Sequence, residues 1–294
     1  MPLRRSPHVV LSPILLLLLA ACAGLEVKPA PVEPPHKAVK VALVLGAGAA
    51  KGFAHVGVLK VLEANHVPVH MVVGTSVGSF VGSLYAYGYT AYDLQKIAMG
   101  IEKGEIADLT VPDNGFLKGE KLEAYVNRMI RGTTMENLRI PFYAVATDIG
   151  SGQEMVFGKG NTGSAVRASC SIPGIFRPVR IGDRTYVDGG VVSPVAVDAA
   201  RRLGADMVIA VDISGGVSGA IPDTTLDTIF QAIGVMYAKI AAAQLPRADV
   251  VIRPKVGYIA SGDFTKRHEA ILEGEKAAQA ALPKIQALLG EPGR

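Results

Sequence analysis

Short apolar runs alternate with longer amphipathic stretches along the chain from residue 40 onward. Apolar runs bounded by glycine or polar residues predict buried strands, and apolar residues spaced three or four apart predict helices. The predicted strands are 40–45, 67–73, 141–147, 154–157, 184–187, 207–211 and 250–253. The predicted helices are 52–65, 77–88, 90–101, 119–131, 161–169, 194–203, 224–245 and 266–289. This alternation indicates an α/β fold, with a mostly parallel sheet covered by helices on both faces and no boundary to a second domain.

The N-terminus resembles a bacterial lipoprotein signal. Two arginines precede an apolar stretch, Leu11 to Ala20, which is too short to be a stable membrane span. The sequence Leu19-Ala20-Ala21-Cys22 is similar to a lipobox, in which residues 1–21 are cleaved off and the Cys22 thiol takes a diacylglyceryl group. The alternative is an ordinary signal peptide cleaved nearby, in which Cys22 has no role.

The residues after Cys22 predict how the protein is attached. Ala23 stands where an inner-membrane retention signal would usually have Asp, so the resemblance implies an outer-membrane protein on the periplasmic side. Residues 22–39 contain four prolines and predict an extended tether. The folded domain is then expected over 40–290, held to the membrane through its lipid anchor.

Composition narrows the class of protein. The chain has 294 residues, of which 49% are hydrophobic and 19% charged, which is ample for one large core. The net charge is +4, and it becomes +2 without the two arginines of the signal peptide. Because no run of Lys and Arg occurs, nucleic acid is a poor candidate partner. No cluster of His, Cys, Asp and Glu has the spacing of a metal site, and Cys170 has no partner once Cys22 is lipidated.

A Gly-x-Ser-x-Gly motif lies between a predicted strand and a predicted helix. Ser76 is at its centre, with Gly74 and Gly78 on either side. In this setting the motif predicts a nucleophile elbow, a strained strand-to-helix turn that holds the serine at the corner. Small residues are needed on both sides, because larger side chains would collide with neighbouring backbone. A glycine- and serine-rich loop without chemistry is the alternative reading of the same residues.

The first predicted strand ends in a run of small residues from Gly46 to Gly52. Lys51 breaks the dinucleotide-binding pattern, and the P-loop pattern fails as well. Small side chains at Ala47, Gly48 and Ala49 would let backbone N–H groups approach the oxygen of a tetrahedral intermediate, as an oxyanion hole requires. A plain tight turn is an equally good interpretation of this loop alone.

The third motif is Asp188-Gly189-Gly190, which follows the predicted strand 184–187. A carboxylate in a glycine-rich turn at a strand end can approach another strand end, where ligand sites form in open α/β sheets. The alternative is a surface Asp in an ordinary turn. Asp148 and Asp212 are rival carboxylates at strand ends, but neither precedes paired glycines.

Together these motifs resemble the patatin-like phospholipase family, over residues 40 to about 260. The order is the same: a glycine-rich loop (46–52), the serine elbow, then Asp-Gly-Gly. Residues 52–59 and 168–176 are similar to segments that flank the site in that family. Two departures are alanines at 47 and 49, where glycine is frequent, and Lys51, where many members have Arg.

The resemblance implies a serine acyl hydrolase without a cofactor, acting on ester-linked acyl chains of lipids. Asp188 would take the proton of Ser76, and the N–H groups near Gly48 would hold the oxyanion. Alternatives are a general esterase or thioesterase on small acyl esters, and a non-catalytic envelope lipoprotein that keeps the fold. His55 is expected to be a packed helix residue, His66 and His70 to face solvent, and His268, which would complete a Ser–Asp–His order, to lie on a solvated helix face.

Overall fold

The structure is a computed structural model that describes residues 39–110, 115–215 and 221–290. The predicted signal peptide, Cys22 and all but the last residue of the predicted tether lie outside the described residues. The described residues all belong to one compact unit.

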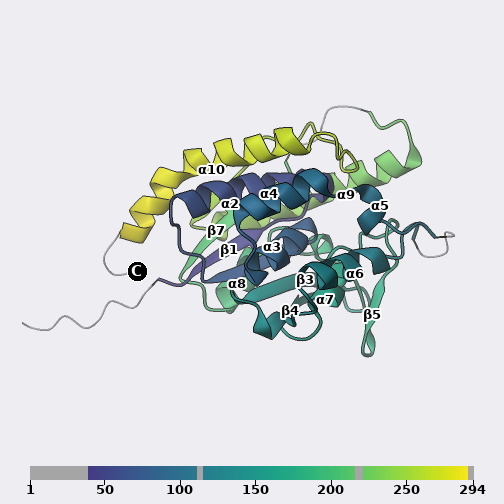
Figure 1. The fold of residues 1–294 in the computed structure, drawn as a ribbon. Helices are drawn as coiled ribbons and strands as arrows, with labels where there is room; N and C mark the ends of the chain where they lie inside the picture. The colour runs from purple at the N-terminus through teal and green to yellow at the C-terminus, as the bar shows by residue number, and fades with distance from the viewer. Residues whose placement is uncertain (1–38, 111–114, 216–220, 291–294) are drawn as a thin grey trace, which may run out of the picture. The chain divides into compact units, whose positions relative to one another are not determined.

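A central sheet runs through this unit in the order β5-β6-β3-β2-β1-β7-β8, and β4 also pairs with β3 (Figure 1). The strands are β1 Val41–Leu45, β2 Met71–Thr75, β3 Phe142–Asp148, β4 Glu154–Phe157, β5 Val179–Ile181, β6 Arg184–Asp188, β7 Met207–Val211 and β8 Val250–Ile252. The pairs among β3, β2, β1, β7 and β8 are parallel, whereas β4, β5 and β6 pair antiparallel. The predicted mostly parallel α/β sheet is therefore confirmed.

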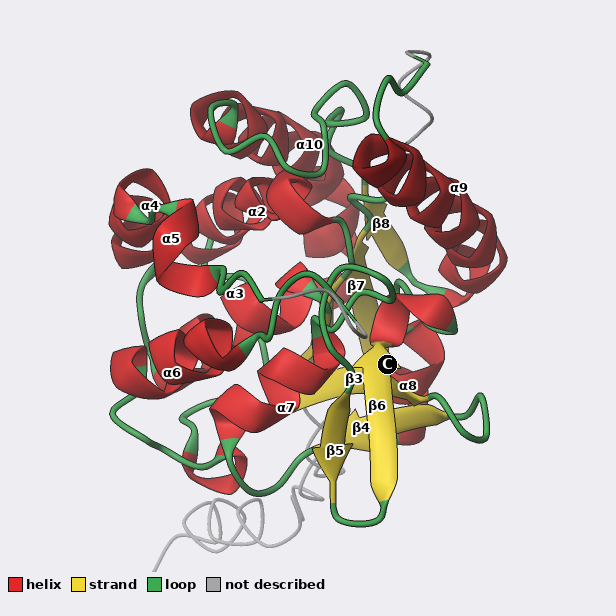
Figure 2. Cartoon of the chain, turned by 90° about the vertical axis from the view of Figure 1, so that its right-hand side faces the viewer, coloured by secondary structure: helices red, strands yellow, loops and turns green. Residues whose placement is uncertain are grey.

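Helices cover both faces of this sheet (Figures 1 and 2). They are α2 Phe53–Ala64, α3 Val77–Tyr87, α4 Ala91–Gly100, α5 Lys103–Ile106, α6 Glu120–Met129, α7 Thr162–Ser169, α8 Val197–Arg202, α9 Thr225–Gln244 and α10 Arg267–Gly290. Side chains alternate along β1, so Leu43 packs into the core under α2, α3 and α10, and Val44 packs into the core under α8. This double burial explains why the parallel strands are continuous apolar runs.

Several predicted boundaries are wrong for identifiable reasons. The strand predicted at 67–73 begins only at Met71, because Val67–His70 forms the loop that leads into it. The helix predicted at 194–203 begins at Val197, since Pro194 lies in an irregular segment whose carbonyl accepts an N–H from the loop after β1. The short elements β5 and α5 were not predicted.

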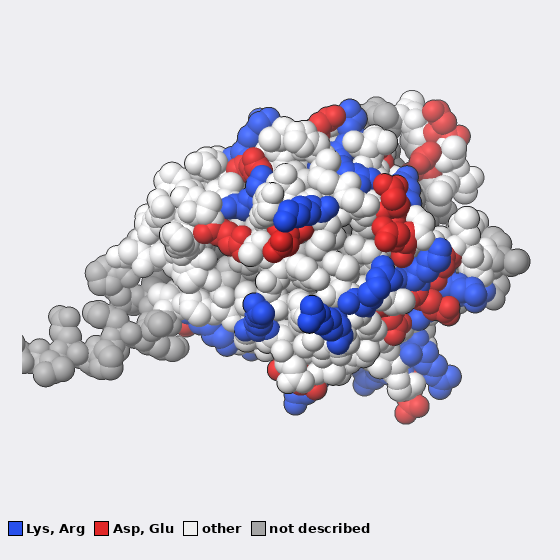
Figure 3. Space-filling view, viewed as in Figure 1, with Lys and Arg blue, Asp and Glu red and all other residues white. Residues whose placement is uncertain are grey.

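The molecular surface carries charges of both signs. On the face shown in Figure 3, Lys and Arg side chains are interspersed with Asp and Glu side chains. His66 and His70 are exposed as expected, and the His70 ring Nδ1 accepts a hydrogen bond of 3.0 Å from the Val41 N–H.

Candidate active site

Ser76 occupies the sharp turn between β2 and α3. Its backbone has φ 55° and ψ −128°, a strained conformation for a residue with a side chain. The Ser76 N–H donates to Ser169 Oγ at 2.9 Å, and Ser169 Oγ donates to the Val145 carbonyl at 2.6 Å. The serine of α7 therefore ties the strained turn to β3, which holds it in place.

The glycines of the elbow allow two close backbone approaches. A methyl group on Gly74 would collide with the backbone of Ser79, and one on Gly78 would collide with the Leu45 carbonyl. Both glycines have ordinary negative-φ backbone, so space rather than backbone freedom requires them. The elbow consequently sits directly against the end of β1, where the small-residue loop begins.

Asp188 reaches Ser76 through the register of the sheet and two glycines. β6 runs antiparallel to β3, with Asp188 opposite Ala146, while Thr75 of β2 lies opposite Val145 on the other side of β3. After Asp188 the chain crosses close over β3, where a methyl group on Gly189 would collide with the Val145 carbonyl. Asp188 therefore approaches the serine from an antiparallel strand, and this approach requires a glycine at position 189.

The Asp188 carboxylate is completely buried. Its Oδ1 accepts the Gly190 N–H at 2.7 Å, whereas its Oδ2 has no hydrogen-bond partner within the described residues. Burial raises the pKa of Asp188 to about 6, and the nearby Ser76 hydroxyl, the Gly190 N–H and the Tyr237 hydroxyl counteract this only in part. The hydroxyls of Ser76 and Tyr237 lie near the carboxylate but do not hydrogen-bond to Oδ2. Catalytic hydrogen bonds are often long or poorly aligned before substrate binds.

Tyr237 of α9 also lies beside this carboxylate, and no motif in the sequence predicts it. Its side chain is 6% exposed, and its hydroxyl has no hydrogen-bond partner in the part of the chain that the structure describes. Burial and the charge of Asp188 raise the pKa of Tyr237 well above its ordinary value, so the hydroxyl keeps its proton as a donor. A methyl group on Gly190 would collide with the Tyr237 ring, which explains the second glycine of the motif.

The loop after β1 presents backbone N–H groups beside Ser76. It forms a short 3₁₀ turn, Ala49–Gly52, ahead of α2. The Ala47 N–H donates to the Pro194 carbonyl at 2.9 Å, so the prediction that Ala47 contributes to an oxyanion hole is wrong. The N–H groups of Gly48 and Ala49 have no acceptor among the described residues and can point to a substrate oxygen. Ala49 has φ 49°, the left-handed conformation that glycine adopts more easily.

His55 hydrogen-bonds to the start of this loop. It is fully buried on α2, and its Nε2 lies 2.8 Å from the Gly46 carbonyl. Burial lowers its pKa to about 4, so the ring is neutral and Nε2–H is the donor. His55 is therefore the packed helix residue that the sequence predicts, and it fixes the start of the loop. His268 is exposed on α10.

The rival carboxylates have other partners. Asp148 accepts the Gly150 N–H and pairs with Arg184 at 3.4 Å. Asp212 accepts from both the N–H and the hydroxyl of Ser214 and pairs with Arg253. Within the described ranges, no group of three His, Cys, Asp or Glu side chains could hold a metal ion.

A largely apolar cavity of about 370 Å³ opens beside Ser76. Its walls include α5 and the segment after it, the first turn of α3, the segment after α7, and the first turns of α9. The larger apolar side chains that line it include Phe80, Leu117, Leu122, Ile175, Phe176 and Phe230. A cavity of this kind accepts a long hydrocarbon group and places its polar end near the serine.

Much of this chain is similar in sequence to known proteins. Residues 43–201 match the sequence profile of the patatin-like phospholipase family. An NTE family protein of Mycobacterium tuberculosis is 33% identical over 187 residues, 63% of this chain and 52% of that protein. Lysophospholipase nte1 of Aspergillus fumigatus is 30% identical over 239 residues, 79% of this chain and 16% of that protein. The chain thus spans about half the length of the first relative and far less of the second.

The fold is also similar to that of VipD from Legionella pneumophila. The TM-score is 0.58 at 13% sequence identity, and the match covers 86% of this chain and 67% of VipD.

Proposed function

Because the chain belongs to the patatin-like phospholipase family, we propose that it hydrolyses ester-linked acyl chains of lipids with Ser76 as nucleophile and Asp188 as base. One observation carries the proposal: a fully buried carboxylate with a pKa of about 6 approaches a serine held in a strained strand-to-helix turn. A carboxylate with its usual pKa near 4 would be a weak base, and burial makes this one stronger.

The chemistry then needs no histidine. Asp188 accepts the hydroxyl proton as Ser76 Oγ attacks the ester carbonyl, and the N–H groups of Gly48 and Ala49 stabilise the oxyanion. The leaving alcohol takes the proton from Asp188, and the acyl group stays on Ser76. Asp188 next accepts a proton from water, which attacks the acyl-enzyme and releases the fatty acid as the proton returns to Ser76.

The apolar cavity favours long acyl chains over small esters. Its lining offers hydrocarbon contact along its length, whereas a short ester would leave most of the volume unfilled. Family membership and the similarity to a lysophospholipase support phospholipids or lysophospholipids as the substrate class. The outer-membrane lipoprotein location belongs to the same proposal, and it rests on the lipobox-like sequence at Cys22.

The nucleophile is tested with Ser76→Ala. This variant is expected to lose hydrolysis of a radiolabelled phospholipid and of a nitrophenyl ester, and to lose labelling by a fluorophosphonate probe. Ser83→Ala is the matched control, because Ser83 is buried in α3, the helix that follows Ser76, and donates to the Phe80 carbonyl. Labelling at another residue, or full activity of Ser76→Ala, would contradict the proposal. Turnover of the nitrophenyl ester alone would indicate a general esterase, and no turnover a non-catalytic protein.

The dyad is tested against a triad with His268→Ala. This variant is expected to keep its activity, whereas Asp188→Asn should lose roughly 10²–10⁴-fold in kcat, the usual cost of a lost general base. Circular dichroism checks that both proteins fold. A folded His268→Ala protein as inactive as Asp188→Asn would place the chain with the Ser–Asp–His hydrolases.

A further inference from the structure

Exposed apolar side chains surround the mouth of the Ser76 cavity. Leu109, Phe116 and Leu226 line the cavity and are 84%, 44% and 44% exposed. Ile221, 87% exposed, lines an adjoining cavity that shares Phe230 with the first. We call Leu109, Phe116, Ile221 and Leu226 the apolar rim. Large apolar groups gathered in this way mark interaction surfaces, whereas single ones do not.

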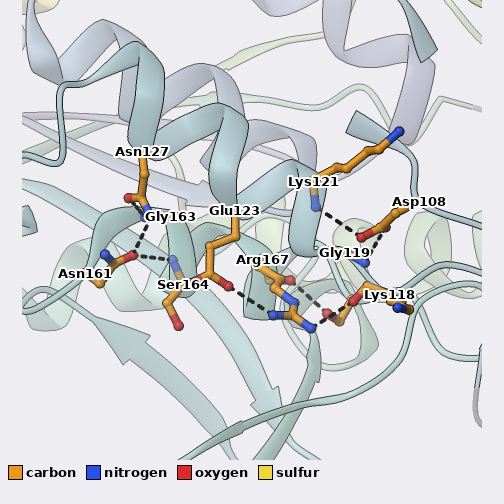
Figure 4. A network of polar contacts seen from close by, with 11 residues as sticks. Asp108, Lys118, Gly119, Lys121, Glu123, Asn127, Asn161, Gly163, Ser164 and Arg167 are labelled. Atoms are coloured by element: carbon orange, nitrogen blue, oxygen red, sulfur yellow. Dashed lines mark hydrogen bonds and ion pairs between the residues drawn. The ribbon is translucent and has the colours of Figure 1, made fainter. Parts of the chain in front are cut away.

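A polar network lies beside Leu109 in the sequence, at Asp108 (Figure 4). The Asp108 carboxylate accepts the N–H groups of Gly119 at 2.6 Å and Lys121 at 3.1 Å. Arg167 of α7 donates to the Lys118 carbonyl at 2.9 Å and pairs with Glu123 at 3.0 Å. The base of the segment that carries Leu109 is therefore fixed to α6 and α7.

Backbone hydrogen bonds extend this anchoring up to the rim itself. The Thr110 N–H donates to the Phe116 carbonyl at 2.9 Å, and the Phe116 N–H donates to the Ile175 carbonyl at 2.9 Å. Leu109 pairs with Leu117 as an isolated antiparallel bridge. Backbone hydrogen bonds therefore fix the chain on either side of Leu109, whose side chain is nevertheless exposed.

Helix α9 also lines the cavity, through Leu226 and Phe230. Only Asp227 and Lys239 are charged among its 20 residues, and its buried side chains lie in its C-terminal half. Together with the next turn, the segment Thr225–Arg247 is apolar and long enough to cross a membrane. Only 11% of its most apolar 18-residue stretch is buried. The N-terminal half of α9 therefore presents apolar surface beside the cavity.

We propose that the apolar rim docks onto the surface of a phospholipid bilayer, so that an acyl chain passes from the membrane into the Ser76 cavity without crossing water. This inference rests on the proposed function for the identity of the substrate. The cavity opens within the rim, so a hydrocarbon path runs from one to the other. A protein partner or a second copy seated on the rim would close the mouth against the substrate. A bilayer covers the same surface and supplies the substrate through it.

The rim is tested by Ile221→Asp in the full chain reconstituted with vesicles of phosphatidylethanolamine and phosphatidylglycerol. Burial of this side chain in lipid is worth at least tenfold in partition, so hydrolysis of vesicle phospholipid should fall roughly tenfold or more. Hydrolysis of a soluble nitrophenyl ester should stay within about twofold, since Ile221 does not line the Ser76 cavity. Tyr92→Asp is the matched control, because Tyr92 is 63% exposed on α4 and lies outside the rim.

A fluorescent probe reports docking without reference to turnover. An environment-sensitive dye on Leu109→Cys, in a Ser76→Ala background, should brighten when vesicles are added, and the same dye on Tyr92→Cys should not. Equal responses at both positions, no response at 109, or unchanged vesicle hydrolysis in the Asp variant would overturn the docking surface. Brightening with protein concentration alone would assign the rim to a second copy. If the dye responds but the native protein cleaves neither substrate, the proposed function fails and the docking surface stands.

Discussion

Replacing Asp188 by Asn should make the protein inactive and, at alkaline pH, more stable. Folding buries this carboxylate completely and raises its pKa from the ordinary 3.8 to about 6. At pH 8 the native state therefore holds a buried negative charge that the unfolded chain would expose to water. Asn has the same shape without the charge, and its amide group can donate to the hydroxyl oxygens of Ser76 and Tyr237.

The size of the effect follows from linkage. Each pKa unit corresponds to about 1.4 kcal/mol, so a shift of about two units costs the ionised native state about 3 kcal/mol. Because the folded pKa is raised, stability is highest below the unfolded pKa near 4 and is lost as the pH rises to 6. Asp188→Asn should then exceed the wild type by about 2–3 kcal/mol in free energy of unfolding at pH 8, and the difference should vanish near pH 4.

Urea unfolding of both proteins at pH 8, 6 and 4 measures this difference. Asp183→Asn is the control, because it makes the same chemical change on an exposed residue and should alter stability at pH 8 by less than about 0.5 kcal/mol. In parallel, wild-type kcat/KM should fall about tenfold per pH unit below 6 as Asp188 is protonated. The reasoning is refuted if Asp188→Asn is no more stable than the wild type at pH 8, or if its advantage grows toward pH 4.

Three further changes test other parts of the site and its attachment. Tyr237→Phe removes a hydroxyl that favours ionised Asp188, so the pH at which kcat/KM begins to fall on the acid side should move above 6, with ester turnover retained at pH 9. If this pH does not change, Tyr237 only packs on Gly190. Ala49→Gly removes the strain of a left-handed alanine, roughly 1 kcal/mol, but increases the entropy of the unfolded chain. The free energy of unfolding should therefore rise by about 0–1 kcal/mol in thermal unfolding, with activity kept. A clear loss of stability would show that the Ala49 methyl group makes stabilising contacts. Cys22→Ser should release the protein from the detergent phase or leave it unprocessed, and wild-type protein that is already soluble in the periplasm would rule out lipidation.

The sequence predicts the central strands well because they are buried on both faces. Leu43 and Val44 pack into different cores, so β1 is apolar at every position and stands out from its surroundings. β5 escapes prediction, since it has three residues and Arg180 in its centre is exposed. Such a short strand is defined by its partner β6 and not by its own pattern.

The sequence likewise predicts some residues of the candidate site and misses others. Ser76 and Asp188 are recognisable because strained or crowded turns require glycines at fixed positions beside them. Tyr237 has no local signal, because it is one aromatic residue in a long apolar helix and meets Asp188 only in the folded chain. Ala47 was assigned wrongly for the same reason, since the acceptor of its N–H lies almost 150 residues away, at Pro194.

The buried Asp188 offsets a sensitivity to acid that the buried His55 gives the fold. The folded pKa of His55, about 4, lies below its unfolded value of 6.5, so this histidine withdraws stability as the pH falls from 6.5 to 4. Asp188 contributes stability over nearly the same interval, because its shift has the opposite sign and a similar size. The contributions of these two groups to stability nearly cancel between pH 6.5 and 4, while the catalytic base becomes protonated. Acid would then inhibit this protein reversibly, and activity would return when Asp188 loses its proton.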